Sequence, residues 1–322
     1  MKRILEIAAA LLVATWLPLS ASAADFAKDL RGASELLAAR KYDEAYKAYL
    51  HAAQDQHNPL AQFTLGLFYE LGWGRPVDRA QACAWQEKSA KGGIPAAEDR
   101  HASCLLNGIG RPADPAEAAR WFDRAGADGH LISYCRLARL YVEGRGVPKD
   151  PAKGLALCEQ VAAKGSPPAM VEVARFHLDG VTGKPDYETA SQLLQQAARL
   201  NSPEAPFLLG KMARDGLGAP AKPDAARFWF ETAASRGYVP AYYQTARLYF
   251  DRRGGPKTGG YVPDYVAKAY MWLSATVART TDKDERAGSA EMLAEIRKIM
   301  PPTWAPDLDK KVKDHLAKFS GE

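Results

Sequence analysis

Small residues recur along the chain with a period of 36 residues, and apolar positions at helical spacing lie between them. One column consists of glycines: Gly72, Gly108, Gly144, Gly180 and Gly216. A second column holds Gly93, Gly129, Gly165, Asn201 and Gly237. A third column is small throughout: Gly66, Ala102, Ala138, Ala174, Gly210 and Ala246. Three columns in phase over five or six units indicate an internal repeat, which decides the fold before any other feature.

The first complete unit shows how each period should fold. Ala61, Leu65 and Phe68 share one helix face by their i, i+3, i+4 spacing, and Gly72 ends that helix. A second helix begins near Asp78 and stops at a pair of glycines. The third column lies in mid-helix, where Gly is about 1 kcal/mol worse than Ala, so it predicts a close approach of two helices. Because one hairpin cannot bury its apolar face alone, we expect an all-α, right-handed superhelical solenoid of helix-turn-helix repeats.

The period also sets the expected domain organisation. A divergent helical hairpin is expected at 25–57, and a C-terminal helical cap at 282–322, with helices at 284–300 and 307–319. The repeats between them are predicted at 58–93, 94–129, 130–165, 166–201, 202–237 and 238–279. In the sixth repeat, Trp272 matches Trp85 only if seven residues are inserted in the Gly- and Pro-rich loop 252–263.

The first 23 residues are typical of a secretory signal peptide. A basic start precedes an apolar stretch, and Ala21-Ser22-Ala23 forms an A-x-A cleavage pattern, so we expect cleavage after Ala23. The alternative is a membrane anchor, but the apolar stretch is shorter than the roughly 20 residues that a bilayer requires. The sequence therefore predicts a periplasmic or secreted protein without a membrane span after cleavage.

The repeat unit resembles the Sel1-like repeat, a branch of the tetratricopeptide-like helical solenoids. The residues that carry this resemblance are Ala61, Leu65, Gly66, Tyr69, Gly72, Gly74, Asp78, Ala82, Trp85, Ala90 and Gly92. Individual units depart from the pattern at Leu157, Thr182, Leu193 and Lys222. The resemblance implies a non-catalytic adaptor that binds protein partners. It also implies a role in the periplasm, at the envelope or against host proteins, as is common for bacterial members with signal peptides.

Composition and motifs exclude several other functions. The chain has 43 Lys and Arg against 38 Asp and Glu, and this small excess argues against nucleic acid as a partner. The sequence contains no H-E-x-x-H, no G-x-S-x-G and no phosphate-binding glycine loop, so we expect no catalytic site, metal or cofactor. A cell-wall hydrolase or β-lactam-processing enzyme is the least favoured alternative. His101 and His177 occupy the repeat positions of Leu65 and Tyr69, which are expected to pack between helices, so both histidines are expected in the core.

Four cysteines in an exported chain favour disulfides over free thiols. Three connectivities are possible, and helix geometry ranks them. Cys83 and Cys104 lie at similar heights on either side of the turn at Gly93, and Cys135 and Cys158 face each other across a hairpin. We therefore predict the pairs Cys83–Cys104 and Cys135–Cys158, the alternative being four buried thiols in the helix packing.

The first helix of each hairpin is expected to line the concave surface of such a stack. The position after the small-residue column holds a cation in four successive units: Arg139, Arg175, Lys211 and Arg247. Aromatic candidates on the same surface are Phe207, Tyr242, Tyr243 and Phe250. Together they predict a groove for protein partners, acidic ones among them, because guanidinium groups suit carboxylates and aromatic rings supply contact area. One alternative ligand is an anionic envelope polysaccharide. The other alternative is that these cations are simply solvated and bind no ligand.

Overall fold

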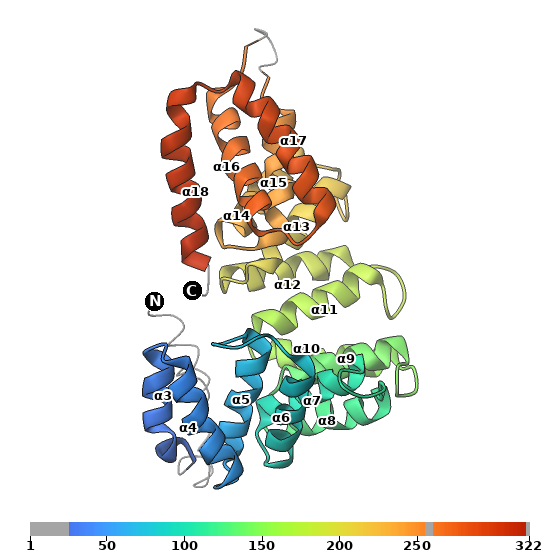
Figure 1. Cartoon of the computed structure of the whole chain (residues 1–322). Coiled ribbons are helices and arrows are strands. Elements are labelled where there is room, and N and C mark those ends of the chain that lie inside the picture. Colours follow the sequence, from blue (N-terminus) through green and yellow to red (C-terminus); the bar gives the residue numbers. More distant parts are fainter. Residues whose placement is uncertain (1–25, 255–259, 320–322) are drawn as a thin grey trace. The chain divides into compact units, whose positions relative to one another are not determined.

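The computed structural model describes residues 26–254 and 260–319, so the predicted signal peptide lies outside the described residues. Within these ranges the chain forms helices and no β-strand, apart from one isolated antiparallel bridge between Gly254 and Tyr261 (Figure 1). The chain divides into two compact units, residues 1–164 and 165–322. The predicted all-α repeat architecture is confirmed.

The first unit is a stack of helical hairpins. Its helices are α3 (Arg31–Ala38), α4 (Tyr42–Gln54), α5 (Pro59–Leu71), α6 (Arg79–Lys91), α7 (Pro95–Asn107), α8 (Pro115–Ala127), α9 (Ser133–Glu143) and α10 (Pro151–Ala163). Each odd-numbered helix packs against the next even-numbered one, and each hairpin packs against its neighbour through α4 and α5, α6 and α7, or α8 and α9. The buried residues form one cluster between Leu30 and Trp85 and another between Ala102 and Leu140.

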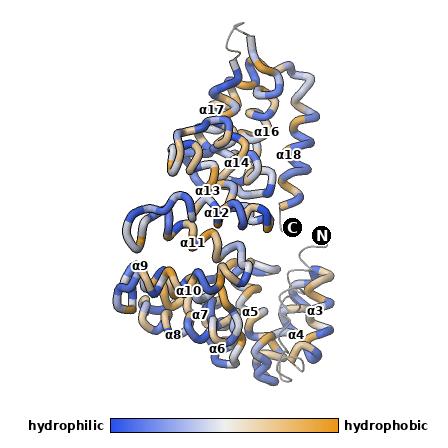
Figure 2. Tube along the Cα trace, turned by 180° about the vertical axis from the view of Figure 1, so that it is seen from behind, coloured by the Kyte–Doolittle hydropathy of each residue, from blue (hydrophilic) through white to orange (hydrophobic). Residues whose placement is uncertain are grey.

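The second unit repeats this arrangement and adds terminal helices. Its elements are α11 (Pro167–Asp179), α12 (Tyr187–Arg199), α13 (Glu204–Asp215), α14 (Pro223–Ser235), α15 (Val239–Asp251), α16 (Pro263–Arg279), α17 (Lys283–Ile299), the 3-10 helix η1 (Pro302–Trp304) and α18 (Ala305–Phe319). Apolar and polar residues alternate along the labelled helices of this unit (Figure 2). This mixture is typical of helices that bury only part of their surface.

Glycines in the left-handed conformation end the first helix of five hairpins. They are Gly72, Gly108, Gly144, Gly180 and Gly216, with φ between 62° and 72°. A residue with a Cβ is strained at such a φ, which explains why glycine occupies this position in five hairpins. Because each glycine stops its helix at the same place, the second helices all begin in the same phase.

The second helices begin at aspartates in four hairpins. The side chains of Asp78, Asp114, Asp150 and Asp186 each accept a hydrogen bond from the backbone N–H three residues later, at 2.8–3.0 Å. This bond satisfies one of the free N–H groups at a helix start. In the fifth unit Lys222 occupies the column, and α14 has no side-chain cap.

Lys222→Asp is therefore expected to stabilise the protein by about 1 kcal/mol, the usual gain from an N-cap. The backbone already has the required geometry, since Lys222 has φ −127° and ψ 91° and Asp78 has φ −135° and ψ 99°. Urea denaturation of the variant and the wild type would measure the gain. Lys222→Ala is the matched control, because it removes the same charge without supplying a cap acceptor, and an equal gain in both variants would contradict the prediction.

Close contacts within each hairpin explain the column of small residues. A Cβ added to Gly66 would lie 2.3 Å from Nε2 of Gln86, and one added to Gly210 would lie 2.7 Å from the ring of Phe230. Ala102, the next residue of the column after Gly66, is fully buried. The predicted close approach of the two helices is confirmed, and it fixes which side of the first helix faces away from the core.

Both predicted disulfides are present, and both lie in the first unit. Cys83–Cys104 joins α6 to α7 and so links two hairpins, with the Cα atoms 5.8 Å apart. Cys135–Cys158 joins α9 to α10 within one hairpin, with the Cα atoms 4.5 Å apart. Both separations fall in the range that a disulfide requires, roughly 4.4–6.8 Å.

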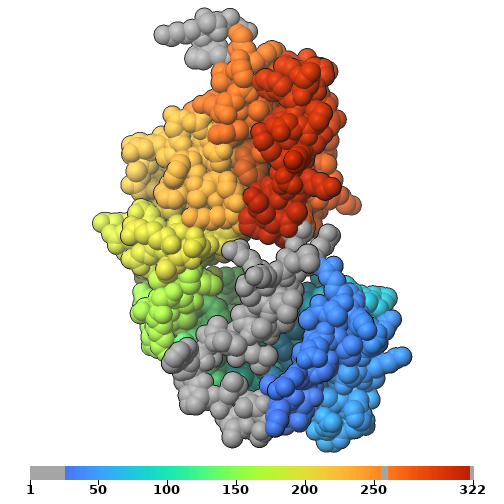
Figure 3. Space-filling view, turned by 90° about the vertical axis from the view of Figure 1, so that its left-hand side faces the viewer, coloured from blue at the N-terminus to red at the C-terminus, as the bar shows by residue number. Residues whose placement is uncertain are grey.

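The last helix packs along the second unit, where Figure 3 shows α18 as a continuous red ridge. Leu308 of α18 is buried in the core that α15 and α16 share. Nε2 of His315 lies 3.1 Å from the hydroxyl of Tyr242, and its ring centroid lies 5.2 Å from that of Trp272. The final turn places Phe319 against Gly237. The chain end therefore covers side chains that the repeats alone would leave open.

Candidate binding surface

The first helices of the hairpins present a polar row of side chains in each unit, which we call the first-helix face. In the first unit this face consists of Glu70, Arg100, Ser103, Arg136 and Arg139. In the second unit it consists of Arg175, Lys211, Arg214, Gln244 and Arg247. All these side chains are at least partly exposed.

The predicted row of four cations is divided between the two units. Arg139 is exposed in the first unit, whereas the other three cations belong to the second. Arg175 forms an ion pair with Glu204 of the next first helix, so its charge is largely neutralised. Lys211 and Arg247 are exposed at the same repeat position of α13 and α15, and neither forms an ion pair within the described residues. These two are the cations of the second unit best placed to meet a ligand.

Two of the four predicted aromatic contacts are wrong. Tyr242 is 1% exposed because α16 and α18 cover it, and its hydroxyl contacts His315. Phe250 is also buried, and the guanidinium of Arg253 stacks 3.6 Å from its ring centroid. Burial in the core removes both rings from any binding surface.

The other two aromatic candidates keep part of their surface exposed. Phe207 packs its ring against Phe230 and Tyr238, with centroids 5.5 Å and 5.2 Å apart, so its main role is in the core. Tyr243 is half-buried on α15, with the guanidinium of Arg247 6.0 Å from its ring centroid. The accessible aromatic surface beside the cations therefore reduces to Tyr243.

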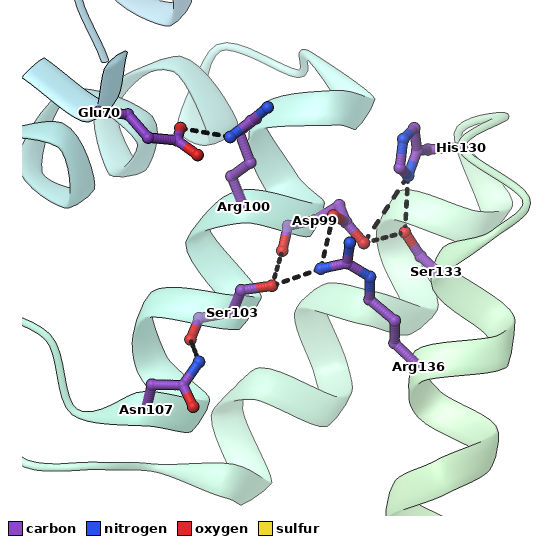
Figure 4. Close-up of polar contacts among 8 residues, drawn as sticks. All are labelled: Glu70, Asp99, Arg100, Ser103, Asn107, His130, Ser133 and Arg136. Atoms are coloured by element: carbon purple, nitrogen blue, oxygen red, sulfur yellow. Dashed lines mark hydrogen bonds and ion pairs between the residues drawn. The ribbon is translucent and has the colours of Figure 1, made fainter. Parts of the chain in front are cut away.

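Polar contacts between successive first helices form a ladder that the sequence analysis missed (Figure 4). Glu70 of α5 forms an ion pair with Arg100 of α7. Arg136 of α9 reaches back to α7, where its Nη1 lies 3.1 Å from Asp99 and donates a hydrogen bond of 2.7 Å to Ser103. Each contact joins two neighbouring hairpins, so the face is internally cross-linked rather than a set of independent side chains.

The ladder continues within the second unit. Arg175 of α11 pairs with Glu204 of α13, and Arg214 of α13 donates a 3.0 Å hydrogen bond to Gln244 of α15. The partners are 29 or 30 residues apart, as are Glu70 and Arg100. A search for complementary side chains at this separation would have found the ladder from sequence, since a period of 36 brings the end of one first helix beside the start of the next.

A buried aspartate lies beneath the ladder of the first unit. Asp99 is 3% exposed and accepts a 2.7 Å hydrogen bond from the hydroxyl of Ser133, whose oxygen lies 2.9 Å from Nδ1 of His130. Burial lowers the pKa of His130, against the opposing effect of Asp99. A nucleophilic serine would give its proton to the histidine, but here the proton points at the aspartate and Ser133 is fully buried. The arrangement fits a structural clasp between α7 and α9, not a catalytic triad.

The neighbouring Glu98 is an unusual carboxyl group. It is fully buried, and burial raises its pKa from 4.5 to about 7. Arg124 opposes this shift, with its Nε 2.9 Å from Oε1 of Glu98, while Asp128 adds to it. Glu98 lies in the first turn of α7 and faces the last turn of α8, so its ionisation acts on the packing of these two helices.

The described residues were also compared with the patterns of a metal site and of a membrane-spanning helix. In residues 26–254 and 260–319, no three His, Cys, Asp or Glu side chains gather as the ligands of a metal ion would. No helix in those ranges is long and apolar enough to cross a bilayer. His101, expected in the core, is 2% exposed and packs edge-on against Trp121 at 5.1 Å. His177, expected in the core as well, is only half-buried on α11.

Comparison with known proteins identifies the repeat family and structures with a similar fold. The Sel1 repeat family matches residues 59–94, 95–130, 131–166, 167–202 and 203–238, each starting one residue after the predicted unit. The structure is similar to that of a Sel1 repeat protein from Oxalobacter formigenes, with TM-score 0.59 and 24% identity over 83% of this chain and 99% of the other. It is also similar to c5321, a protective antigen of uropathogenic Escherichia coli strains with an SLR fold, with TM-score 0.49 and 24% identity over 80% of this chain and 57% of that one. No curated protein matches the sequence. Because the repeat matches cover more than half of its length, the chain belongs to the Sel1 repeat family.

Proposed function

We propose that this chain is a non-catalytic scaffold, periplasmic or secreted, that binds partner proteins through the first-helix face. Sel1 repeat proteins are generally protein-interaction scaffolds, which supports the coarse assignment. The observation that carries the finer one is the pair Lys211 and Arg247, exposed at the same position of adjacent first helices, with Tyr243 close to Arg247. Two exposed cations, one of them next to an aromatic ring, suit a partner segment that carries carboxylates.

The proposed compartment rests on the cysteines and on the N-terminal sequence. Two disulfides in one chain are typical of oxidising compartments such as the periplasm or the extracellular space. The signal peptide predicted for residues 1–23 agrees with this compartment and remains a prediction from sequence.

Reversing both charges, with Lys211→Glu and Arg247→Glu together, is expected to abolish partner capture without changing the melting temperature. Both side chains are exposed, and neither forms an ion pair within the described residues, so the fold does not depend on them. Capture from an envelope extract, quantified by mass spectrometry against the wild type, measures the first effect. Thermal unfolding measures the second.

Lys310→Glu with Lys313→Glu is the matched control, because it makes the same change of charge at exposed positions of α18. Proteins captured by the wild type and the control but lost with the first-helix variant would support the proposal. Capture of the same proteins by all three would refute it. Salt-sensitive retention on an acidic glycan column, lost only in the first-helix variant and without any protein partner, would favour the polysaccharide alternative.

A further inference from the structure

The last helix, α18, lies along α16 and is attached to the second unit by few buried side chains (Figure 1). Of residues 305–319, only Leu308 is buried, while Val312 and Leu316 pack partly buried against the same core. A hollow of about 380 Å³ lies between the first turn of α18, η1 and the start of α16, so packing at this end is incomplete. The chain is extended at Pro301, with φ −55° and ψ 129°, which allows α18 to move without unfolding α17.

Three polar contacts join α18 to α15 and α16. The hydroxyl of Tyr270 donates a 2.7 Å hydrogen bond to Asp309, and Nη2 of Arg279 donates one of 3.1 Å to a backbone carbonyl near the end of α18. The third contact joins Nε2 of His315 to the hydroxyl of Tyr242 at 3.1 Å. It differs from the others because histidine is the side chain whose charge ordinarily changes between about pH 5 and pH 8.

His315 also lies within a cluster of aromatic rings. Its ring centroid is 5.6 Å from that of Tyr242, 5.2 Å from that of Trp272 and 5.1 Å from that of Phe319. Tyr242 of α15 is 1% exposed, and Trp272 of α16 is 7% exposed. One side chain of α18 therefore contacts both helices of the sixth hairpin, and its displacement would uncover two buried rings.

The contact between His315 and Tyr242 suits the neutral imidazole. A neutral ring can accept the proton of a hydroxyl at Nε2, whereas both nitrogens of the charged ring are donors. Burial raises the pKa of Tyr242, against the opposing effect of Arg279, so its hydroxyl keeps its proton. Protonation of His315 would therefore deprive this buried hydroxyl of its acceptor, which is unfavourable inside a protein.

The charged groups around the imidazole also oppose a proton on it. Burial lowers the pKa of His315 and Lys318 lowers it further, while a backbone hydrogen bond at the end of α14 acts in the opposite sense. Arg279 is the cation that α16 places at the end of α18. Arg236, at the end of α14, donates to carbonyl groups of the preceding hairpin, and the acid next to His315, Asp314, is exposed. A proton on the imidazole would add a further positive charge beside Lys318 and Arg279.

We propose that α18 is a latch, held closed by the neutral form of His315 and released when this side chain takes up a proton. In the released helix the imidazole is in solvent, where its pKa is about 6.5, whereas in the closed form its pKa is lower. The released form therefore binds the proton more tightly, and its fraction rises as the pH falls below about 6.5. Release uncovers the rings of Tyr242 and Trp272. The latch does not depend on the binding proposed for the first-helix face.

Hydrogen exchange of the full chain, followed by mass spectrometry at pH 7.5 and pH 5 and corrected for the intrinsic rate of exchange, tests the latch. Peptides from α18 should lose protection at pH 5, while peptides from α11 to α13 should keep it. The ring resonances of the histidines in NMR spectra give the titration midpoint of His315, identified by its absence from the spectrum of His315→Gln. This midpoint should coincide with the midpoint for loss of protection.

Two variants separate the charge of His315 from its packing. His315→Gln keeps an acceptor for the hydroxyl of Tyr242 and does not titrate, so its α18 should stay protected at both pH values. His315→Lys is charged at both, so its α18 should lack protection even at pH 7.5. His51→Gln makes the same change at an exposed histidine of α4 and is the matched control, for which we expect the behaviour of the wild type.

Protection of α18 that persists at pH 5 in the wild type would overturn the proposal, and so would an equal loss in the wild type and His315→Gln. Loss of protection throughout the second unit would show acid unfolding of the whole unit and would also overturn it. His315→Phe, which keeps a ring and cannot titrate, gives a second measurement if α18 of His315→Gln is detached at both pH values. If both variants are detached, the two midpoints of the wild type decide, because only a latch makes them coincide.

Discussion

Loss of the two disulfides is expected to destabilise the first unit and to leave the second unit unchanged. Cys83 and Cys104 are 21 residues apart, and Cys135 and Cys158 are 23 apart. Closing loops of that length in the unfolded chain corresponds to about 3 kcal/mol per bridge. Because both bridges lie within residues 1–164, none of this stabilisation belongs to the second unit.

Hydrogen exchange followed by mass spectrometry, with and without a reductant, would measure the effect unit by unit. Peptides from α5 to α10 should lose protection on reduction, while peptides from α11 to α18 should keep it. A variant with all four cysteines changed to alanine is the control, because the reductant should then have no effect. Equal loss of protection in both units would contradict the prediction.

Glu98→Gln is expected to stabilise the protein by about 3 kcal/mol above pH 7 and to have little effect near pH 4.5. The pKa of Glu98 is about 7 in the folded chain, against 4.5 for an unperturbed glutamate. The folded state therefore binds the proton more tightly than the unfolded state, and stability falls as pH rises between these two values. Glutamine resembles the protonated form, so the variant avoids this loss.

Urea denaturation of the wild type and Glu98→Gln, at pH 4.5 and at pH 8, would test this. The free energies of unfolding should converge at the lower pH and separate at the higher one. Glu143→Gln at an exposed position of α9 is the matched control, for which we expect no comparable separation. A constant difference between Glu98→Gln and the wild type across this range would show that the buried charge is not the cause.

The parts of the fold that follow from short-range spacing could be predicted from the sequence. Gly72 and its equivalents mark where first helices end, because only glycine adopts that backbone conformation without strain. The disulfide partners followed from counting residues on both sides of a turn, since antiparallel helices bring equal distances to equal heights. His101 was expected in the core because it occupies the column of Leu65.

The binding surface was harder to predict, because burial depends on helices distant in sequence. Tyr242 has the spacing of an exposed aromatic residue, but α18 covers it through His315, 73 residues further along the chain. Arg175 has the position of a free cation, but Glu204 in the next hairpin neutralises it. Glu98 occupies the same repeat position as Gln62, which is buried. A carboxyl group at a repeat position that packs in the core was the sequence feature that could have indicated its raised pKa.

The ladder between first helices also limits how such a gene can change in length. Within a unit, its rungs join side chains 29 to 37 residues apart, so each rung spans one whole second helix and the turns around it. Recombination that duplicates or removes one full period keeps these separations, whereas a smaller insertion inside that span would break a rung. The longer loop of the sixth hairpin, between α15 and α16, lies beyond Gln244, the last rung partner among the described residues, so its length interrupts none of these rungs.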